Sequence, residues 1–280
     1  QEARGRRRRG GPVLEGCEEE EDHVSFRGAK KIADRAPAPK PRLAAPPARP
    51  WRFRRWLARL FAVSSLVLAG YHGWVFRQVW RLREHNPHTT AFMQNGLERL
   101  QSSNPMARLE HRWVPYEQIS EHLKRAVLAA EDQRFLDHEG FDVGAIQEAY
   151  EKNARGGRIR HGASTISQQL ARNLFLSPRR TYLRKAQEAV ITMMIEHVLS
   201  KRRILEVYLN VIEWGNGIYG AEAAAQHYYG EAAADLEPEE AARLAALIPS
   251  PRLYTRNPST PYLEQRTEVL LGQMEYVRVP

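Results

Sequence analysis

Acidic side chains crowd the segment from Glu131 to Asp142, which reads E-D-Q-R-F-L-D-H-E-G-F-D. The residues just before it predict a helix over 120–132 with apolar side chains on one face. A carboxyl group that leaves such a face is partly desolvated, which raises its pKa and suits it to exchange protons near neutral pH. A helix end with solvated acids explains the same pattern, and the spacing of Asp137, His138 and Asp142 gives only a weak indication of a metal site.

A second polar motif, G-A-S-T-I-S-Q-Q-L-A-R-N-L-F-L, occupies residues 162–176. A helix that begins near Ser164 would bury one stripe of side chains, formed by Ile166, Leu170 and Leu174. The opposite, polar face would carry Thr165, Gln168, Gln169 and Arg172. Small residues, two hydroxyls and free N–H groups at a helix start predict an anion site, to which Arg172 and Arg180 add charge. A well-capped amphipathic helix with a solvated polar face is the alternative.

A third motif, R-K-A-Q-E at 184–188, places Lys185 and Glu188 three positions apart. On one helix face such a cation and carboxylate influence each other, although a surface ion pair is the commoner outcome. The motif K-R-R-I-L-E-V-Y-L-N follows at 201–210, and its large apolar side chains predict core positions: Ile204, Leu205, Tyr208 and Leu209.

Helices must position these motifs, because the chain beyond His85 has helical periodicity and almost no alternating strand pattern. Besides 120–132, the pattern predicts helices over 182–197, 200–212 and 237–247, the last opened by Pro238. The 280 residues, 42% of them hydrophobic, are enough for one main domain. A formal charge of +9 suits a phosphate-bearing partner such as nucleic acid, anionic lipid or a diphosphate. The single Cys17 excludes an intrachain disulfide and a thiolate metal cluster.

The first 50 residues combine an arginine run, an acidic block and a Pro/Ala/Arg segment, which predicts a disordered tail. Residues 60–76 contain no Asp, Glu, Lys or Arg, and tryptophans bracket them. This pattern predicts a short membrane-spanning helix, with the preceding arginines on the cytoplasmic side. A cleaved signal peptide whose apolar stretch ends near Ala69 and an ordinary buried helix are the alternatives.

The ordered set of motifs resembles the glycosyltransferase family that polymerises lipid II, in particular its monofunctional, membrane-anchored members (glycosyltransferase family 51). E-D-x-x-F-x-x-H-x-G, G-A-S-T-I-x-Q-Q-x-x-R-N-L-F-L, R-K-x-x-E and K-x-x-I-L-x-x-Y-L-N all occur in the family's order. N-P-H-T-T-A-F-M and G-A-E-A-A-A-Q-H-Y-Y-G support the match, which covers roughly 86–274. The resemblance implies a mostly α, lysozyme-like, two-lobed domain over 84–280, behind a tail (1–50) and a single transmembrane anchor (51–83).

The resemblance also implies roles for individual residues. Glu131 matches the general base that deprotonates the acceptor hydroxyl, and Glu188 matches a second carboxylate that assists departure of the donor's diphosphate. The positions matched to the donor's diphosphate and sugars are Ser164, Thr165, Gln168, Gln169, Arg172, Arg180 and Lys185. Supporting positions are Asp132, Phe135, His138 and Asn210. Two departures occur: Arg172 stands where the family usually has Lys, and Ala163 replaces the second Gly of the commoner Gly-Gly-Ser-Thr form.

As partners, the resemblance implies lipid II, the growing lipid-linked glycan chain, the membrane, and proteins of cell-wall synthesis or division, but no nucleic acid. A divalent cation, Mg²⁺ or Mn²⁺, would bridge the diphosphate, and no organic cofactor is expected. The catalytic domain would face the periplasm from the inner membrane. Two rival functions stay open: a lysozyme-like hydrolase, and a basic, membrane-tethered module that binds nucleic acid or anionic lipid.

Overall fold

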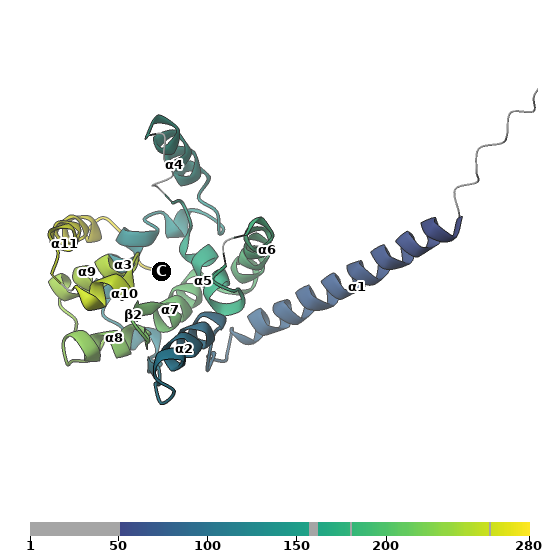
Figure 1. Ribbon diagram of the computed structural model, residues 1–280. Helices are drawn as coiled ribbons and strands as arrows, with labels where there is room; N and C mark the ends of the chain where they lie inside the picture. Colours follow the sequence, from purple (N-terminus) through teal and green to yellow (C-terminus); the bar gives the residue numbers. More distant parts are fainter. Residues whose placement is uncertain (1–50, 157–161, 180, 258) are drawn as a thin grey trace, which may run out of the picture. The chain divides into compact units, whose positions relative to one another are not determined.

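The computed structural model describes residues 51–156, 162–179, 181–257 and 259–280 (Figure 1). Within them the chain is mostly helical, as the sequence predicted. The α-helices are α1 (Trp51–Arg81), α2 (Ala91–Ser103), α3 (Glu121–Glu131), α4 (Val143–Gly156), α5 (Ile166–Phe175), α6 (Tyr182–Val198), α7 (Lys201–Val211), α8 (Ala221–Tyr228), α9 (Pro238–Leu247), α10 (Pro251–Arg256) and α11 (Pro261–Met274). Two short 3-10 turns, η1 (Tyr116–Gln118) and η2 (Phe135–Asp137), precede and follow α3.

The four predicted helices are confirmed to within about one residue at each end. Their starts follow from side-chain capping, because an oxygen before the first turn accepts an otherwise unpaired N–H. Ser120, Thr181 and Ser200 cap α3, α6 and α7 in this way, and Pro238 occupies the first turn of α9. The local sequence therefore determines where the helices that carry the motifs begin.

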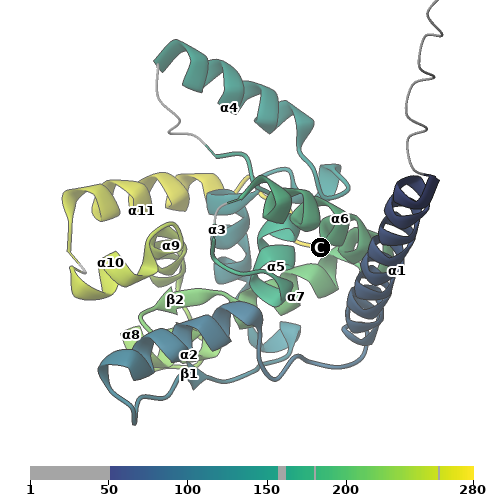
Figure 2. The same cartoon turned by 45° about the vertical axis from the view of Figure 1, so that its right-hand side comes forward.

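The helices share one hydrophobic core and pack in two groups of neighbours (Figure 2). In one group α3 contacts both α9 and α11, which also contact each other. In the other group α5 contacts α2, α6 and α7. The predicted core positions on α3, α5 and α7 are all buried. The first acidic motif begins at the end of α3 and the second motif leads into α5, and the two meet where the Ile166 N–H donates to Asp132 Oδ2 at 2.9 Å.

A small three-stranded sheet, which the helical periodicity did not predict, supports α7 and α8. Its order is β1 (Glu110–His111), β3 (Ile218–Tyr219) and β2 (Glu213–Gly215), with β1 parallel and β2 antiparallel to β3. A Gly at position 220 follows β3 with φ +86°, and a Cβ there would lie 2.8 Å from the Asn210 carbonyl oxygen. Glycine is therefore required for the close packing of this turn on α7.

The α1 helix is longer than the segment predicted for it, and its C-terminal part packs into the core through Val75 and Val79. In the described part of the chain, no helix is long and apolar enough to cross a membrane. The spanning helix predicted over 60–76 is therefore not supported. That uncharged stretch holds two serines, two glycines and one histidine, and arginines lie close to both of its ends. The predicted tail, 1–50, lies outside the described residues.

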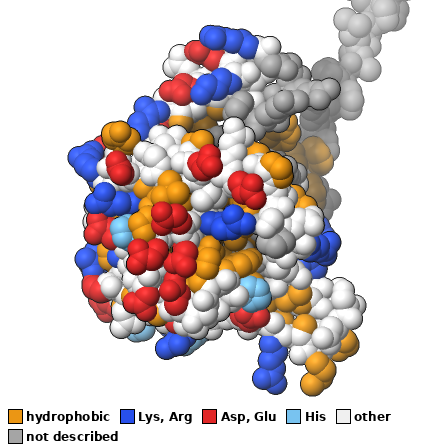
Figure 3. Space-filling model, turned by 90° about the vertical axis from the view of Figure 1, so that its left-hand side faces the viewer, with side chains coloured by type: hydrophobic (Ala, Val, Ile, Leu, Met, Phe, Trp, Pro, Cys, Tyr) orange, Lys and Arg blue, Asp and Glu red, His pale blue; other side chains and the backbone are white. Residues whose placement is uncertain are grey.

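Charge is distributed unevenly despite the positive total. Asp and Glu side chains gather on the face shown in Figure 3. One acidic group lies at the start of α9 and comprises Glu231, Asp235, Glu237 and Glu240. The pKa of Glu231 is raised, first by its hydrogen bond with Glu240 and then by partial burial and the nearby negative charges. This part of the surface would repel a polyanion.

Candidate active site

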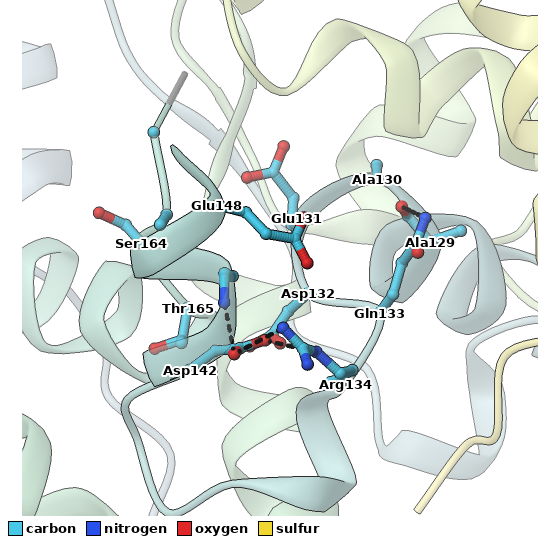
Figure 4. Close-up of a pocket in the computed structure, with 13 residues that line it drawn as sticks. Ala129, Ala130, Glu131, Asp132, Gln133, Arg134, Asp142, Glu148, Ser164 and Thr165 are labelled. Atoms are coloured by element: carbon cyan, nitrogen blue, oxygen red, sulfur yellow. Dashed lines mark hydrogen bonds and ion pairs between the residues drawn. The ribbon is translucent and has the colours of Figure 1, made fainter. Parts of the chain in front are cut away.

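The Glu131 side chain lies at the last residue of α3 and lines a cavity of about 340 Å³. Four carboxylates line this acid-lined cavity, those of Glu131, Asp132, Asp142 and Glu148 (Figure 4). Burial raises the pKa of Glu131 above its usual value. A hydrogen bond from Gln169 and the positive charges of Arg266 and Arg172 offset part of that rise. Glu131 is thus the desolvated acid that the sequence predicted at this helix end.

The neighbouring Asp132 has a different environment, since it is buried and each of its carboxylate oxygens has a partner within the protein. Its Oδ2 accepts the Ile166 N–H at 2.9 Å, and its Oδ1 lies 2.9 Å from His138 Nε2. The Gly140 N–H donates to His138 Nδ1 at 3.1 Å, so Nε2 is the ring nitrogen that donates to Asp132. Asp132 and His138 therefore hold the acidic turn against the start of α5.

Ser164 and Thr165 line the other side of the acid-lined cavity, on the loop that enters α5 (Figure 4). Thr165 and Gln168 form a capping box, and the Thr165 hydroxyl also donates to the Gly140 carbonyl at 2.7 Å. These bonds and the one to Asp132 occupy the N–H groups of Thr165, Ile166 and Gln168. The expectation of free N–H groups for an anion at this helix start is wrong for these three, because the protein's own oxygens accept them.

A second, larger cavity of about 560 Å³ is lined by Gln169, Tyr208 and three arginines, Arg172, Arg184 and Arg252. Glu213 is the carboxylate among the residues that line it, and it pairs with Arg252. The Nε atoms of Arg172 and Arg184 are buried and have no hydrogen-bond partner in the described structure. Buried donors without a partner are uncommon in folded proteins, and here they belong to cations that border a cavity. This arginine-lined cavity is suited to an anion.

The predicted Lys185–Glu188 pair is present on α6, but it is not a surface pair. Glu188 is 2% exposed and binds both Lys185 Nζ and Arg184 Nη1, the latter at 2.8 Å. Glu188 is not among the residues that line either cavity, whereas its partner Arg184 lines the arginine-lined one. Glu188 thus contacts a residue that lines the arginine-lined cavity, Arg184, but does not line the cavity itself. Arg180 lies outside the described residues.

The remaining predicted positions have structural partners. Asn210 is fully buried, and its amide exchanges hydrogen bonds with the Val114 backbone at 2.9 and 3.0 Å. Phe135 is buried edge-on against the His138 ring. These two residues fix the segments around the site and do not line either cavity.

Comparison with known proteins identifies the family. The family model described as Transglycosylase matches residues 98–275. The chain belongs to the transglycosylase family. Proteins named biosynthetic peptidoglycan transglycosylase are 57% identical over 228 residues in Nitrosospira multiformis and 59% identical over 226 residues in Azoarcus sp.. Each alignment covers 81% of this chain, and it covers 99% and 97% of the two relatives. The prediction of a peptidoglycan glycosyltransferase is confirmed at the level of family and enzyme class.

Three residues of this transglycosylase matter for the site although none of them was predicted as a site residue. The sequence places Arg184 in the R-K-A-Q-E motif without a role of its own, and it predicts Tyr208 as a core residue. Lys201 donates to the His138 carbonyl at 2.6 Å and to Glu196 at 2.8 Å, and Glu196 accepts the Ser167 hydroxyl. An i,i+4 relation to Glu188 could have indicated Arg184. The contacts of Lys201 with the His138 carbonyl and of Tyr208 with Gln169 join distant segments.

The weak indication of a metal site is not supported by the transglycosylase fold. Asp137 pairs with Arg278, Asp142 with Arg134, and His138 with Asp132, so the three side chains face different partners. Within the described ranges no group of three His, Cys, Asp or Glu side chains is placed to hold a metal ion. The expected Mg²⁺ or Mn²⁺ stays a prediction.

Proposed function

We propose that this peptidoglycan glycosyltransferase transfers a lipid-diphosphate-linked glycan to the sugar hydroxyl of an incoming lipid II molecule, with Glu131 as the general base. The observation that carries this proposal is the position of Glu131. Its desolvated carboxyl group opens on the acid-lined cavity and is hydrogen-bonded to Gln169 of the arginine-lined cavity. A proton acceptor and an anion site therefore adjoin, as the displacement of a diphosphate by a hydroxyl requires.

In the proposed step the acceptor hydroxyl oxygen attacks the anomeric carbon of the donor. The new C–O bond forms as the bond to the diphosphate breaks, and the bonding pair leaves with the diphosphate. The hydroxyl proton passes to Glu131, whose raised pKa makes it a better proton acceptor than an ordinary solvated carboxylate. Attack opposite the leaving group inverts the configuration at the anomeric carbon.

Charge on the leaving diphosphate grows during the step, so fixed cations nearby lower the barrier. Arg172 and Arg184 are the candidates for this role, because both line the arginine-lined cavity with an Nε that lacks a protein partner. The family resemblance adds Lys185 and Arg180 as further cations for the diphosphate. Glu188 is proposed to act by holding Arg184 and Lys185 in place, since it binds both. A divalent cation would then be bound together with the diphosphate, and the proposed roles of these side chains do not depend on it.

Lipid-linked substrates require contact with a membrane, and α1 is the element proposed to make it. Large apolar side chains stay exposed on successive turns of this helix, among them Trp56, Leu60, Val67 and Trp74. Exposed apolar surface of this kind is typical of membrane or protein contacts. The enzyme would thus act at the extracytoplasmic face of the inner membrane, and contacts with cell-wall synthesis or division proteins stay a prediction.

The direct test is to incubate the detergent-solubilised protein with labelled lipid II and to analyse the glycan chains, with and without a divalent cation. Glu131→Gln should lower the rate by about 10² to 10⁴, because it removes the general base while keeping the side-chain size. Wild-type-like polymerisation by this variant would reject the mechanism. Incubation with polymeric peptidoglycan distinguishes the hydrolase, which would release soluble fragments.

The binding-module rival is tested separately. Deletion of residues 1–50 should leave polymerisation intact if the enzyme assignment holds. A module that acts through its arginine-rich tail would instead lose its ligand on deletion and at raised salt concentration.

A further inference from the structure

One amide side chain, that of Gln169, joins the two cavities through three contacts. Its Nε2 donates to Glu131 Oε2 at 2.7 Å and lies 3.4 Å from the Ser164 carbonyl oxygen. Its Oε1 accepts the Tyr208 hydroxyl at 3.0 Å. The amide is thus surrounded by two acceptors on its nitrogen side and one donor on its oxygen side. Only one of its two flip states satisfies all three partners.

We propose that Tyr208 and Gln169 are positioning residues for the reaction, in which the Tyr208 hydroxyl locks the Gln169 amide so that its N–H group faces the Glu131 carboxylate. This inference rests on the proposed role of Glu131 as the base. Tyr208, a core residue of α7, thereby has a part in the reaction, although it acts only through Gln169.

The direction of the lock matters because a carboxylate and a carboxylic acid prefer opposite amide ends. An ionised Glu131 is an acceptor only, and it is stabilised by an N–H donor. A flipped amide would present Oε1, which favours the protonated acid and disables the base. Tyr208 opposes the flip, because its buried hydroxyl donates to Oε1 and a flipped amide would leave that O–H without this acceptor. Burial raises the pKa of Tyr208 well above the usual value, so the hydroxyl stays protonated.

Other charged groups also face Glu131 and act on the same equilibrium. Arg266 on α11 and Arg172 on α5 favour the ionised form, whereas the adjacent Asp132 opposes it. Glu148 on α4 and Arg134 line the same cavity. Gln169 is the direct hydrogen-bond donor to the carboxylate among these groups, and Tyr208 is the residue that fixes its orientation. Loss of the lock should therefore change how the rate depends on pH.

The test compares pH–rate profiles of the full-length enzyme with labelled lipid II. Gln169→Leu should move the acidic limb to higher pH and lower kcat on that limb by roughly tenfold, the effect of one unit in pKa. Tyr208→Phe should move the limb in the same direction by less, because the Ser164 carbonyl still favours the correct amide orientation. The double variant should shift it no further than Gln169→Leu alone, since both changes act through one amide.

Tyr116→Phe is the matched control. Tyr116 is also buried, and its hydroxyl donates to a backbone carbonyl, that of Pro280, at 2.9 Å. It should lose stability without any shift of the acidic limb. An unshifted limb in Tyr208→Phe, or additive shifts in the double variant, would overturn the inference.

A readout independent of turnover is the titration of the Glu131 carboxyl carbon by NMR in protein with ¹³C-labelled glutamate, assigned with Glu131→Gln. The titration midpoint should rise in Gln169→Leu and in Tyr208→Phe, and an unchanged midpoint in both would refute the lock. The two proposals fail differently. Full activity of Glu131→Gln would reject the role of Glu131 as the base. An inactive Glu131→Gln together with an unshifted titration midpoint in Tyr208→Phe would reject the lock alone.

Discussion

The acid-lined and arginine-lined cavities meet at the hydrogen bond between Glu131 and Gln169, yet they carry opposite charge. Carboxylates dominate the first, and unpartnered arginine nitrogens border the second. The first can receive a proton from a neutral hydroxyl, and the second can stabilise a departing anion. In the proposed mechanism the acceptor hydroxyl and the donor diphosphate would therefore be separated by charge, on the two sides of the Gln169 side chain.

After the loss of Glu131 itself, the largest effect should come from removing cations of the arginine-lined cavity. Arg172→Ala and Arg184→Ala should each lower kcat by about 10² to 10³, the usual effect of losing one fixed donor to developing negative charge. Steady-state rates with lipid II measure this. Arg134→Ala is the control, because that half-exposed arginine pairs with Asp142 in the acid-lined cavity. An equal loss in Arg134→Ala would show that charge on the two sides is not separated as proposed.

A smaller effect, on stability, should follow from Asp132→Ala. This change leaves the Ile166 N–H and the His138 Nε2–H without their acceptor, and buried unpaired donors cost about 1 to 3 kcal/mol. Chemical denaturation would measure the loss. Asp137→Ala, which removes an exposed carboxylate paired with Arg278, should change the free energy of unfolding by less than about 1 kcal/mol. Comparable losses in both would contradict a structural role for Asp132.

Glu131→Gln should stabilise the fold at neutral pH. Because the pKa of Glu131 is raised in the folded state, its contribution to stability is greatest below the usual value of 4.5 and is lost as the pH rises through the folded value. Glutamine removes that loss. Thermal unfolding at pH 7 and at pH 4 should show a higher Tm for the variant only at pH 7. A lower Tm at neutral pH would contradict the desolvation of this carboxyl group.

The smallest effect should come from Arg172→Lys, which introduces the residue that the family resemblance implies at this position. Lysine keeps the charge but lacks the planar fork of donors, so donor KM should change by only a few fold. Titration of the donor at fixed acceptor concentration would measure it. A loss as large as that of Arg172→Ala would show that the guanidinium geometry, and not the charge, is what the site requires.

The sequence by itself predicted the helices that carry the motifs and a desolvated acid at the end of one of them. Capping residues and apolar periodicity predict α3, α6, α7 and α9 within about one residue, because these signals are local in the chain. The raised pKa of Glu131 follows from its place at the end of an apolar helix, whereas the order of the motifs indicates the family and, by resemblance, the proposed role of this residue.

Only the tertiary structure decided what the other polar residues contact. Asp132 accepts the N–H of the first residue of α5, Glu188 is buried against Arg184, and the Tyr208 hydroxyl donates to Gln169. Each contact depends on how a side chain emerges from packed helices, and in two of the three the partners are more than 30 positions apart. Sequence periodicity shows which face of a helix is buried, but the partner of a buried polar atom is fixed only when the helices pack.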